Sequence, residues 1–158
     1  MANETAPEPA PAMPPETGPV LMLQNVYLKD CSYEAPQGPR LEGNWNPQIN
    51  LDLQTNSSVL NADLREVVLT VTVSAKQNDA TIFLVEVKQA GAFISRGLND
   101  NDLKRAISTV CPGVLFPFAR AVVSQLVTQG GFPQFLLPPV NFDALYAQNQ
   151  AQQPTTTN

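Results

Sequence analysis

Residues 64–90 read LREVVLTVTVSAKQNDATIFLVEVKQA, and they carry the clearest structural signal in the chain. From Leu64 to Lys76, valine and leucine alternate mainly with polar residues, and the run from Ala80 to Ala90 alternates in a similar way. Period-two alternation is typical of a β-strand with one buried face and one wetter face. Because Gln77-Asn78-Asp79 is a short turn between the two runs, the segment predicts an antiparallel hairpin.

Two further strands are predicted before this hairpin, over residues 21–34 and 48–54. In the first of them Asp30 and Glu34 have the same parity, so both should face the same side of the sheet, whereas Tyr27 has the other parity. Because short links join consecutive strands, the four strands predict an antiparallel meander.

The period changes in the second half of the chain, where helices are expected. Residues 99–110 predict a short helix with acidic residues in its first turn, and Pro112 should end it. A second helix should begin at Pro117 and end at Gly130, since proline is tolerated in a first turn and glycine is frequent at a helix C-terminus. A third helix should follow Asn141, which resembles an N-cap. The chain is therefore predicted to be α+β.

The second predicted helix is apolar almost all the way round, with few polar side chains along it. A helix that is apolar on more than one face must be covered on more than one side. One sheet within a single domain covers one side, so we expect a second subunit to cover the other.

Composition excludes several classes of protein. The chain has 158 residues, no histidine and a net charge of −5. An acidic chain lacks the basic surface on which nucleic-acid binding rests, so no nucleic-acid partner is expected. Without histidine there is no Ser-His or Cys-His nucleophile, and no phosphate-binding loop is present, so neither a metal nor a cofactor is expected. The two cysteines, Cys31 and Cys111, are expected to be small buried residues in a reducing compartment.

Carboxylate pairs are the remaining route to catalysis. Asp100 and Asp102 open a predicted helix, where acidic side chains interact favourably with the helix dipole. Asp30 and Glu34 should lie on an open sheet face, whereas catalytic carboxylates usually lie in a cleft that shifts their pKa values. The sequence therefore predicts that the protein is not an enzyme.

Shifts in composition mark the ends of the predicted domain. Residues 1–19 are rich in alanine, proline and glutamate and predict a disordered tail, residues 20–150 form one domain, and residues 151–158 form a flexible polar tail. The start of the chain lacks the basic residues and apolar run of a signal peptide, and no stretch approaches the roughly 20 apolar residues of a membrane span. We expect a cytoplasmic protein without direct membrane insertion.

Most of the large aromatic residues lie in predicted connecting segments or at the starts of helices. They could plug the core between sheet and helices, or line an apolar groove suited to an extended peptide. The residue pattern alone leaves both interpretations open. The residues are Tyr33, Trp45, Phe116, Phe118, Phe132, Phe135, Phe142 and Tyr146.

Four blocks of the sequence resemble those of SecB, the bacterial protein-export chaperone. The most distinctive is CPGVLFPFAR at residues 111–120. The blocks YLKDCSYEAP at 27–36 and WNPQINLDL at 45–53 precede it, and the run from FPQ to PVNFDAL at 132–145 follows it. The blocks occur in order over about residues 21–147, so the resemblance is far more specific than any short motif.

This resemblance implies a fold, an assembly and a function. The implied fold is a four-stranded antiparallel sheet with helices packed on one face, assembled as a homotetramer that is a dimer of dimers. The implied function is that of an ATP-independent holdase, which binds unfolded preproteins, keeps them translocation-competent and delivers them to the SecA motor ATPase for export across the inner membrane. Any zinc in that exchange would belong to SecA.

The resemblance also assigns two surfaces. The resemblance implies that SecA binds on the exposed sheet face, through Asp30, Glu34, Leu84 and Glu86. The resemblance also implies a groove for client peptides, beside the connection of the first two strands and the last helix. The residues implied to line this groove are Trp45, Phe116, Phe118, Phe142 and Tyr146. The predicted strand parity independently puts Leu84 and Glu86 on one face.

Two alternative functions remain at this point. One is a SecB-like chaperone dedicated to a toxin–antitoxin system, although the complete SecA-binding set favours a SecA partner. The other is a small enzyme that uses carboxylates, which the absence of histidine and of a phosphate-binding loop disfavours.

Overall fold

The computed structural model describes residues 18–39 and 43–153, so residues 1–17 of the expected N-terminal tail and residues 154–158 lie outside it. Seven elements occur in this part of the chain. The strands are β1 (Val20–Glu34), β2 (Gln48–Val59), β3 (Leu64–Gln77) and β4 (Ala80–Arg96), and the helices are α1 (Asp100–Ser108), α2 (Val110–Gln129) and α3 (Phe142–Gln152).

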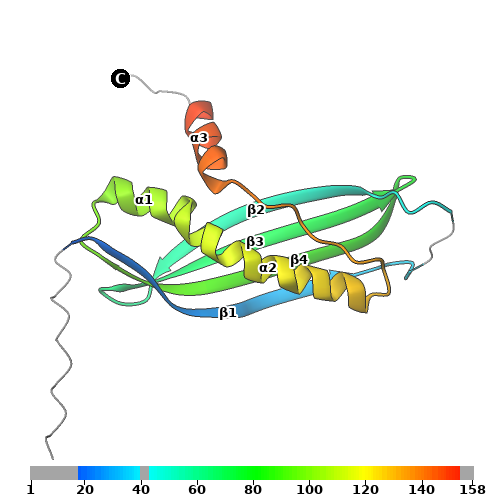
Figure 1. The fold of residues 1–158 in the computed structure, drawn as a ribbon, viewed down its shortest axis with the longest axis horizontal. Helices are drawn as coiled ribbons and strands as arrows, with labels where there is room; N and C mark the ends of the chain where they lie inside the picture. The colour runs from blue at the N-terminus through cyan, green and yellow to red at the C-terminus, as the bar shows by residue number, and fades with distance from the viewer. Residues whose placement is uncertain (1–17, 40–42, 154–158) are drawn as a thin grey trace, which may run out of the picture.

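The four strands form one fully antiparallel sheet in the order β1-β4-β3-β2, which confirms the predicted α+β class (Figure 1). The predicted meander is right for β2, β3 and β4 but wrong for β1, which pairs with β4 rather than with β2. The reason lies in the connection over residues 35–47, which contains Pro36, Pro39 and Pro47 and is far longer than a hairpin turn. It carries the chain to the opposite edge, so β1 and β2 are the two edge strands.

The predicted hairpin of β3 and β4 is confirmed. Asn78 and Asp79 both have positive φ, at 53° and 61°, as a two-residue turn of the primed type requires, and asparagine and aspartate tolerate this conformation well. Both β2 and β4 continue past the predicted ends at Gln54 and Ala90, because the later residues keep pairing with β3 although their own alternation fades.

The core lies between one face of the sheet and α2. In β3, every second residue from Val67 to Ala75 is completely buried. These side chains meet a buried stripe along α2 that includes Leu115, Ala119 and Val123. Figure 1 shows α2 lying across the sheet and the connection after it running back alongside, which brings Phe132 into the same core. None of the described helices covers the other face of the sheet, and we call it the open face.

The helix boundaries differ from the prediction. Pro112 does not end the first helix; the break comes at Thr109, whose φ and ψ are −126° and −66°, and α2 already begins at Val110. Pro112 therefore lies in the first turn of α2, where its missing N–H costs no helical bond. Pro117 does not start the helix but lies inside it, so the carbonyl of Gly113 loses its usual donor.

The stretch Asp100–Gln129 was not expected to reach the length of a membrane span, yet by length and composition it could, with a mean hydropathy of 1.6 over its most apolar window. Of that window, 44% is buried inside the protein. A buried core helix passes the same test, and the packing of α2 on the sheet accounts for those of its apolar side chains that are buried.

The two cysteines are in different environments. Cys111 is buried in α2, as expected, and burial raises the pKa of its thiol to about 12. Cys31 is exposed, which contradicts the prediction. It lies on the edge strand β1, whereas α2 packs mainly against β3 and β4.

Candidate binding surfaces

The four residues implied for SecA binding lie together on the open face. Leu84 and Glu86 alternate along β4 with Val85 and Val87, which are buried against the helix layer, so Leu84 and Glu86 point the other way. Glu34 pairs directly with Leu84, and Asp30 lies two rows further along β1, opposite Lys88. We call Asp30, Glu34, Leu84 and Glu86 the open-face set.

The register of β1 is irregular just before the open-face set. The pairing of β1 with β4 shifts by one residue between Leu28 and Asp30, and again between Leu23 and Asn25. A bulge of this kind moves the following side chains to the opposite face. The predicted parity of β1 is therefore right for Asp30 and Glu34 but wrong for Tyr27, which lies on the open face and not with the buried residues.

The electrostatics of the open-face set are those of a small acidic patch around an apolar residue. Asp30, Glu34 and Glu86 supply three carboxylates, and Lys88 offsets one of them across the strand pair. Glu86 accepts a long hydrogen bond from the Thr72 hydroxyl at 3.5 Å. Leu84 remains 38% exposed among these charges. Such a surface can bind a basic segment that also presents an apolar side chain.

Beside the open-face set, Lys29, Tyr27 and Glu66 form a polar cluster across the sheet. The Lys29 Nζ donates to Glu66 at 2.6 Å, and the Tyr27 hydroxyl donates to the other carboxylate oxygen. The Lys29 and Tyr27 hydrogen bonds hold the pKa of Glu66 below its usual value. The bond to Glu66, together with burial, raises the pKa of Tyr27 to about 12. This cluster is internally satisfied, so we regard it as structural.

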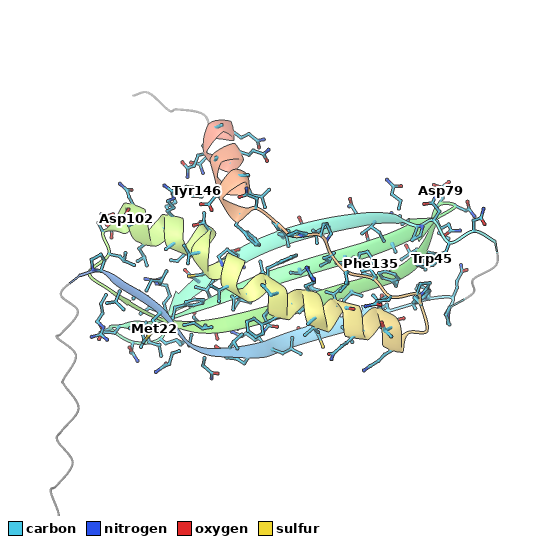
Figure 2. All side chains as sticks on the ribbon, viewed as in Figure 1. Met22, Trp45, Asp79, Asp102, Phe135 and Tyr146 are labelled. Carbon is cyan, nitrogen blue, oxygen red and sulfur yellow. The ribbon has the colours of Figure 1, made fainter. Side chains whose placement is uncertain are left out.

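Close to the C-terminal end of α2, aromatic rings pack together in a cluster that we call the aromatic corner. Trp45 stacks on Phe132 with ring centroids 5.7 Å apart, and Phe132 contacts Phe83 at 5.4 Å. Phe135 meets Phe83 edge-on at 6.3 Å. Trp45 is 36% exposed, so it is the surface member of the stack, and Figure 2 shows it beside Phe135.

The end of α2 holds the aromatic corner close to β1. A Cβ at Gly130 would lie 1.8 Å from the Tyr33 hydroxyl, so only glycine fits there. The Tyr33 hydroxyl is buried without a hydrogen-bond partner among the residues that the structure describes, and burial raises its pKa. Pro39, from the connection between β1 and β2, lies against Gly131. This connection is thus anchored next to Trp45.

A second candidate site, lined by both apolar and polar side chains, lies between β2, α1 and α3, and we call it the α3 pocket. It encloses about 280 Å³. Leu53 and Thr55 of β2 line one side, and Leu145 and Tyr146 of α3 line another. Phe142 closes it from within and packs edge-on against Phe116 at 6.0 Å.

The five residues implied for the client groove therefore do not form one surface. Trp45 belongs to the aromatic corner, and Tyr146 lines the α3 pocket, well away from Trp45 (Figure 2). Phe116 and Phe142 are only 5% and 8% exposed, so they support the surface from beneath. Phe118 is 45% exposed on the outer side of α2.

Sequence reasoning missed Leu53, Lys104 and Leu145 as pocket residues. Leu53 has the inward parity of β2, but only the strand order shows that β2 is an edge strand beside a helix. Lys104 lies on α1 and Leu145 on α3. The sequences of these two helices do not indicate that they lie side by side, because that depends on the tertiary fold.

No group of three or more Cys, Asp or Glu side chains that could hold a metal ion is found among residues 18–39 and 43–153. The side chains described on these surfaces offer apolar contacts, hydrogen-bonding groups and charges.

Comparison with known sequences places residues 15–153 in the family described as "Preprotein translocase subunit SecB". A protein-export protein SecB of Nitrosococcus oceani is 50% identical over 133 residues, which cover 82% of this chain and 81% of the relative. That of Pseudomonas syringae pv. syringae is 46% identical over 134 residues, covering 84% and 83%. That of Hahella chejuensis is 45% identical over 140 residues, covering 85% and 88%.

Among solved structures, a SecB-like chaperone of Mycobacterium tuberculosis, in complex with a ChAD peptide from an antitoxin, has a similar fold. The TM-score is 0.64, and the match covers 77% of this chain and 88% of the other. At 13% identity this likeness concerns the fold alone.

Proposed function

Because the chain belongs to the SecB family, we propose that it is an ATP-independent chaperone that binds unfolded preproteins in the cytoplasm, keeps them translocation-competent and delivers them to SecA for export. One observation carries the proposal beyond family membership. All four residues of the open-face set, from two strands far apart in the sequence, lie together on a sheet face that none of the described helices covers.

We propose that the open-face set is the SecA-binding surface. Its three carboxylates suit a basic partner, and the exposed Leu84 adds an apolar contact at the centre. Exposed charges at an interface mainly increase the association rate and are weakened by salt. Each carboxylate should therefore contribute about 1 kcal/mol or less to binding.

Unfolded clients would bind on the helix side through the aromatic corner and the α3 pocket. Both sites present partly exposed aromatic or aliphatic side chains, such as Trp45 and Tyr146. The nearby β2 is an edge strand, so its outer backbone groups are free to pair with an extended client. Many weak contacts of this type suit a chain whose sequence varies.

The proposed assembly is a homotetramer, a dimer of dimers. Its support is the outer side of α2, where Val110 and Phe118 are 52% and 45% exposed and Val114 and Val122 are partly exposed. An apolar helix face of this kind is typically covered by another subunit.

The function is tested by diluting a denatured, signal-bearing precursor into buffer with the protein and without nucleotide. We expect the precursor to remain unfolded and soluble, and purified SecA then to take it over. If the precursor refolds or aggregates at its unassisted rate, the chaperone function is wrong.

The SecA surface has its own test, in which the double variant Asp30→Asn, Glu86→Gln is compared with the wild type. We expect weaker SecA binding at low salt and unchanged retention of the unfolded precursor. A matched control is the double variant Asp79→Asn, Asp100→Asn, which removes the same charge from the exposed β3–β4 turn and from the first turn of α1 and should leave SecA binding intact. Equal loss in both variants would mean that only overall charge matters.

The alternative of a toxin–antitoxin chaperone has less support. The solved structure with the antitoxin peptide is 13% identical to this chain, whereas the protein-export relatives are 45–50% identical. Failure of SecA to accept a precursor that the protein does hold would favour this alternative.

A further inference from the structure

Gln77, the last residue of β3, binds the connection between β1 and β2 through its side chain. Its amide nitrogen donates to the Asn44 carbonyl oxygen at 3.0 Å, and its amide oxygen accepts from the Asn46 N–H at 3.3 Å. Asn44 and Asn46 are the residues on either side of Trp45. One side-chain amide therefore holds the backbone before and after this exposed tryptophan, and we call the two hydrogen bonds the Gln77 clamp.

The register of β2 and β3 explains why a side chain takes this role. Gln48 is the first residue of β2 and pairs with Lys76. If the pairing continued by one residue, Pro47 would lie opposite Gln77. Because proline has no N–H to donate, the backbone alone cannot continue the pairing through this residue. The Gln77 amide supplies one donor and one acceptor, as a peptide group does, and so holds the segment just before β2.

The Gln77 clamp joins Trp45 to a part of the fold that has little freedom to move. Gln77 directly precedes the turn of Asn78 and Asp79, whose two positive φ angles are those of a tight hairpin. The Trp45 ring stacks on Phe132, which is 5% exposed and belongs to the core. Trp45 is thus held at its backbone by Gln77 and at its ring by Phe132, while its outer surface stays exposed.

We propose that Gln77 is a positioning residue for client binding, which fixes the Trp45 indole on the client-binding surface before a client arrives. This inference rests on the proposed client binding at the aromatic corner and adds the residue that keeps this site in order. Ordering a mobile side chain on binding costs free energy, and a side chain that is already held in place avoids much of that cost. Loss of the Gln77 clamp should therefore weaken client binding, although Gln77 itself need not touch the client.

Trp45 is the single tryptophan of the chain, so its fluorescence reports directly on the Gln77 clamp. In Gln77→Met, which keeps the length of the side chain and loses both hydrogen bonds, we expect Trp45 emission to shift to longer wavelength and acrylamide to quench it more strongly. Gln77→Glu, which loses the donor to Asn44 at neutral pH, should shift the emission in the same direction. The matched control is Gln54→Met, the same substitution at an exposed glutamine of β2 away from the aromatic corner, which should leave the emission unchanged.

Client affinity is measured by fluorescence anisotropy with fluorescein-labelled, reduced and carboxamidomethylated α-lactalbumin, a chain that stays unfolded without denaturant. We expect Gln77→Met to bind this chain about two- to tenfold more weakly than the wild type does, the range that ordering one side chain costs. Gln54→Met should bind it with the affinity of the wild type. Circular dichroism should show the same sheet content in all variants.

A double-mutant cycle tests whether Gln77 acts through Trp45. Trp45→Leu should itself weaken client binding, and adding Gln77→Met to it should cause little further loss, because the ring that the Gln77 clamp holds is already absent. If the two losses add in full, Gln77 affects clients by another route and the inference is wrong.

The outcomes separate this inference from the proposed function. If the wild type binds the unfolded chain but Gln77→Met binds it equally well, or if the Trp45 emission of Gln77→Met is unchanged, the inference is wrong and the chaperone function stands. If the wild type does not bind the unfolded chain at all, the proposed function fails, and this inference fails with it.

Discussion

At the scale of single residues, Glu66 links the fold to pH. Its pKa is lowered in the folded state, first by the hydrogen bond from Lys29 and then by that from Tyr27. Because the pKa of Glu66 is lower in the folded state than in the unfolded state, its ionised carboxylate stabilises the fold. This stabilisation is complete above the unfolded-state pKa of about 4.3 and is lost as the pH falls through the folded-state pKa. We predict that Glu66→Gln lowers the free energy of unfolding by about 1–2 kcal/mol at pH 7 and by much less at pH 3.

Urea unfolding at the two pH values measures this difference. Glu34→Gln is the control, because this exposed carboxylate makes no ion pair with any residue that the structure describes, and its replacement should change stability by less than about 0.5 kcal/mol. An equal loss at pH 3 and pH 7 in Glu66→Gln would mean that packing, rather than charge, explains the effect.

Gly91 of β4 lies in the core where there is no room for a side chain. A Cβ there would lie 2.8 Å from Phe93, 2.9 Å from Leu115 and 3.1 Å from Leu23. All three side chains belong to the core, so they have little room to move. We predict that Gly91→Ala destabilises the protein by about 1–3 kcal/mol in thermal or urea unfolding. Gly113→Ala is the matched control; its Cβ would meet nothing closer than 4.0 Å, so equal destabilisation by both would refute the explanation.

At the scale of secondary-structure elements, α3 depends on local interactions more than the rest of the fold. Asn141 caps it by accepting a hydrogen bond from the Ala144 N–H at 3.0 Å, and Phe142 is its one buried residue. Loss of an N-cap costs about 1 kcal/mol. We predict that Asn141→Ala speeds hydrogen exchange in α3 and weakens binding of apolar peptides, while exchange in the sheet stays unchanged.

The control for this prediction is the other side-chain N-cap. Asn99 accepts a hydrogen bond from the Asp102 N–H at 2.8 Å, so Asn99→Ala should speed exchange at the start of α1 instead. Faster exchange throughout the sheet in Asn141→Ala would show that α3 is not an independent element.

Strands and helices whose own residues show a clear hydrophobic period could be predicted from the sequence. The elements that pair or pack with them could not. The hairpin of β3 and β4 follows from alternation and from Asn78-Asp79, and Asn141 correctly marks α3. The pairing of β1 with β4 and the bulge near Lys29 depend on neighbouring strands, so the predicted meander and the parity of Tyr27 were wrong. The predicted helix start at Pro117 was also wrong. The local sequence would interrupt a helix there, but packing on the sheet keeps α2 helical through Pro117.

At the scale of the whole molecule, the candidate sites could likewise be predicted only in part from the sequence. Alternation within one strand correctly puts Asp30 with Glu34, and Leu84 with Glu86, but only the strand order makes them one surface. The aromatic residues divide into core and surface through tertiary packing, which explains why composition could not tell buried Phe142 from exposed Trp45.

The exposed side of α2 supports the last prediction, which concerns assembly. Phe118 is 45% exposed, and in an assembly that covers this side an aspartate there would be buried without a partner, at a cost of several kcal/mol. We predict that Phe118→Asp shifts the native mass by light scattering from four times 17.1 kDa toward smaller species, while the circular dichroism of the sheet is retained. Val59→Asp is the matched control, because Val59 is 65% exposed at the end of β2 and does not belong to the outer side of α2. If Phe118→Asp keeps the full mass but no longer holds unfolded precursor, Phe118 contacts clients and the assembly must be stabilised by another surface.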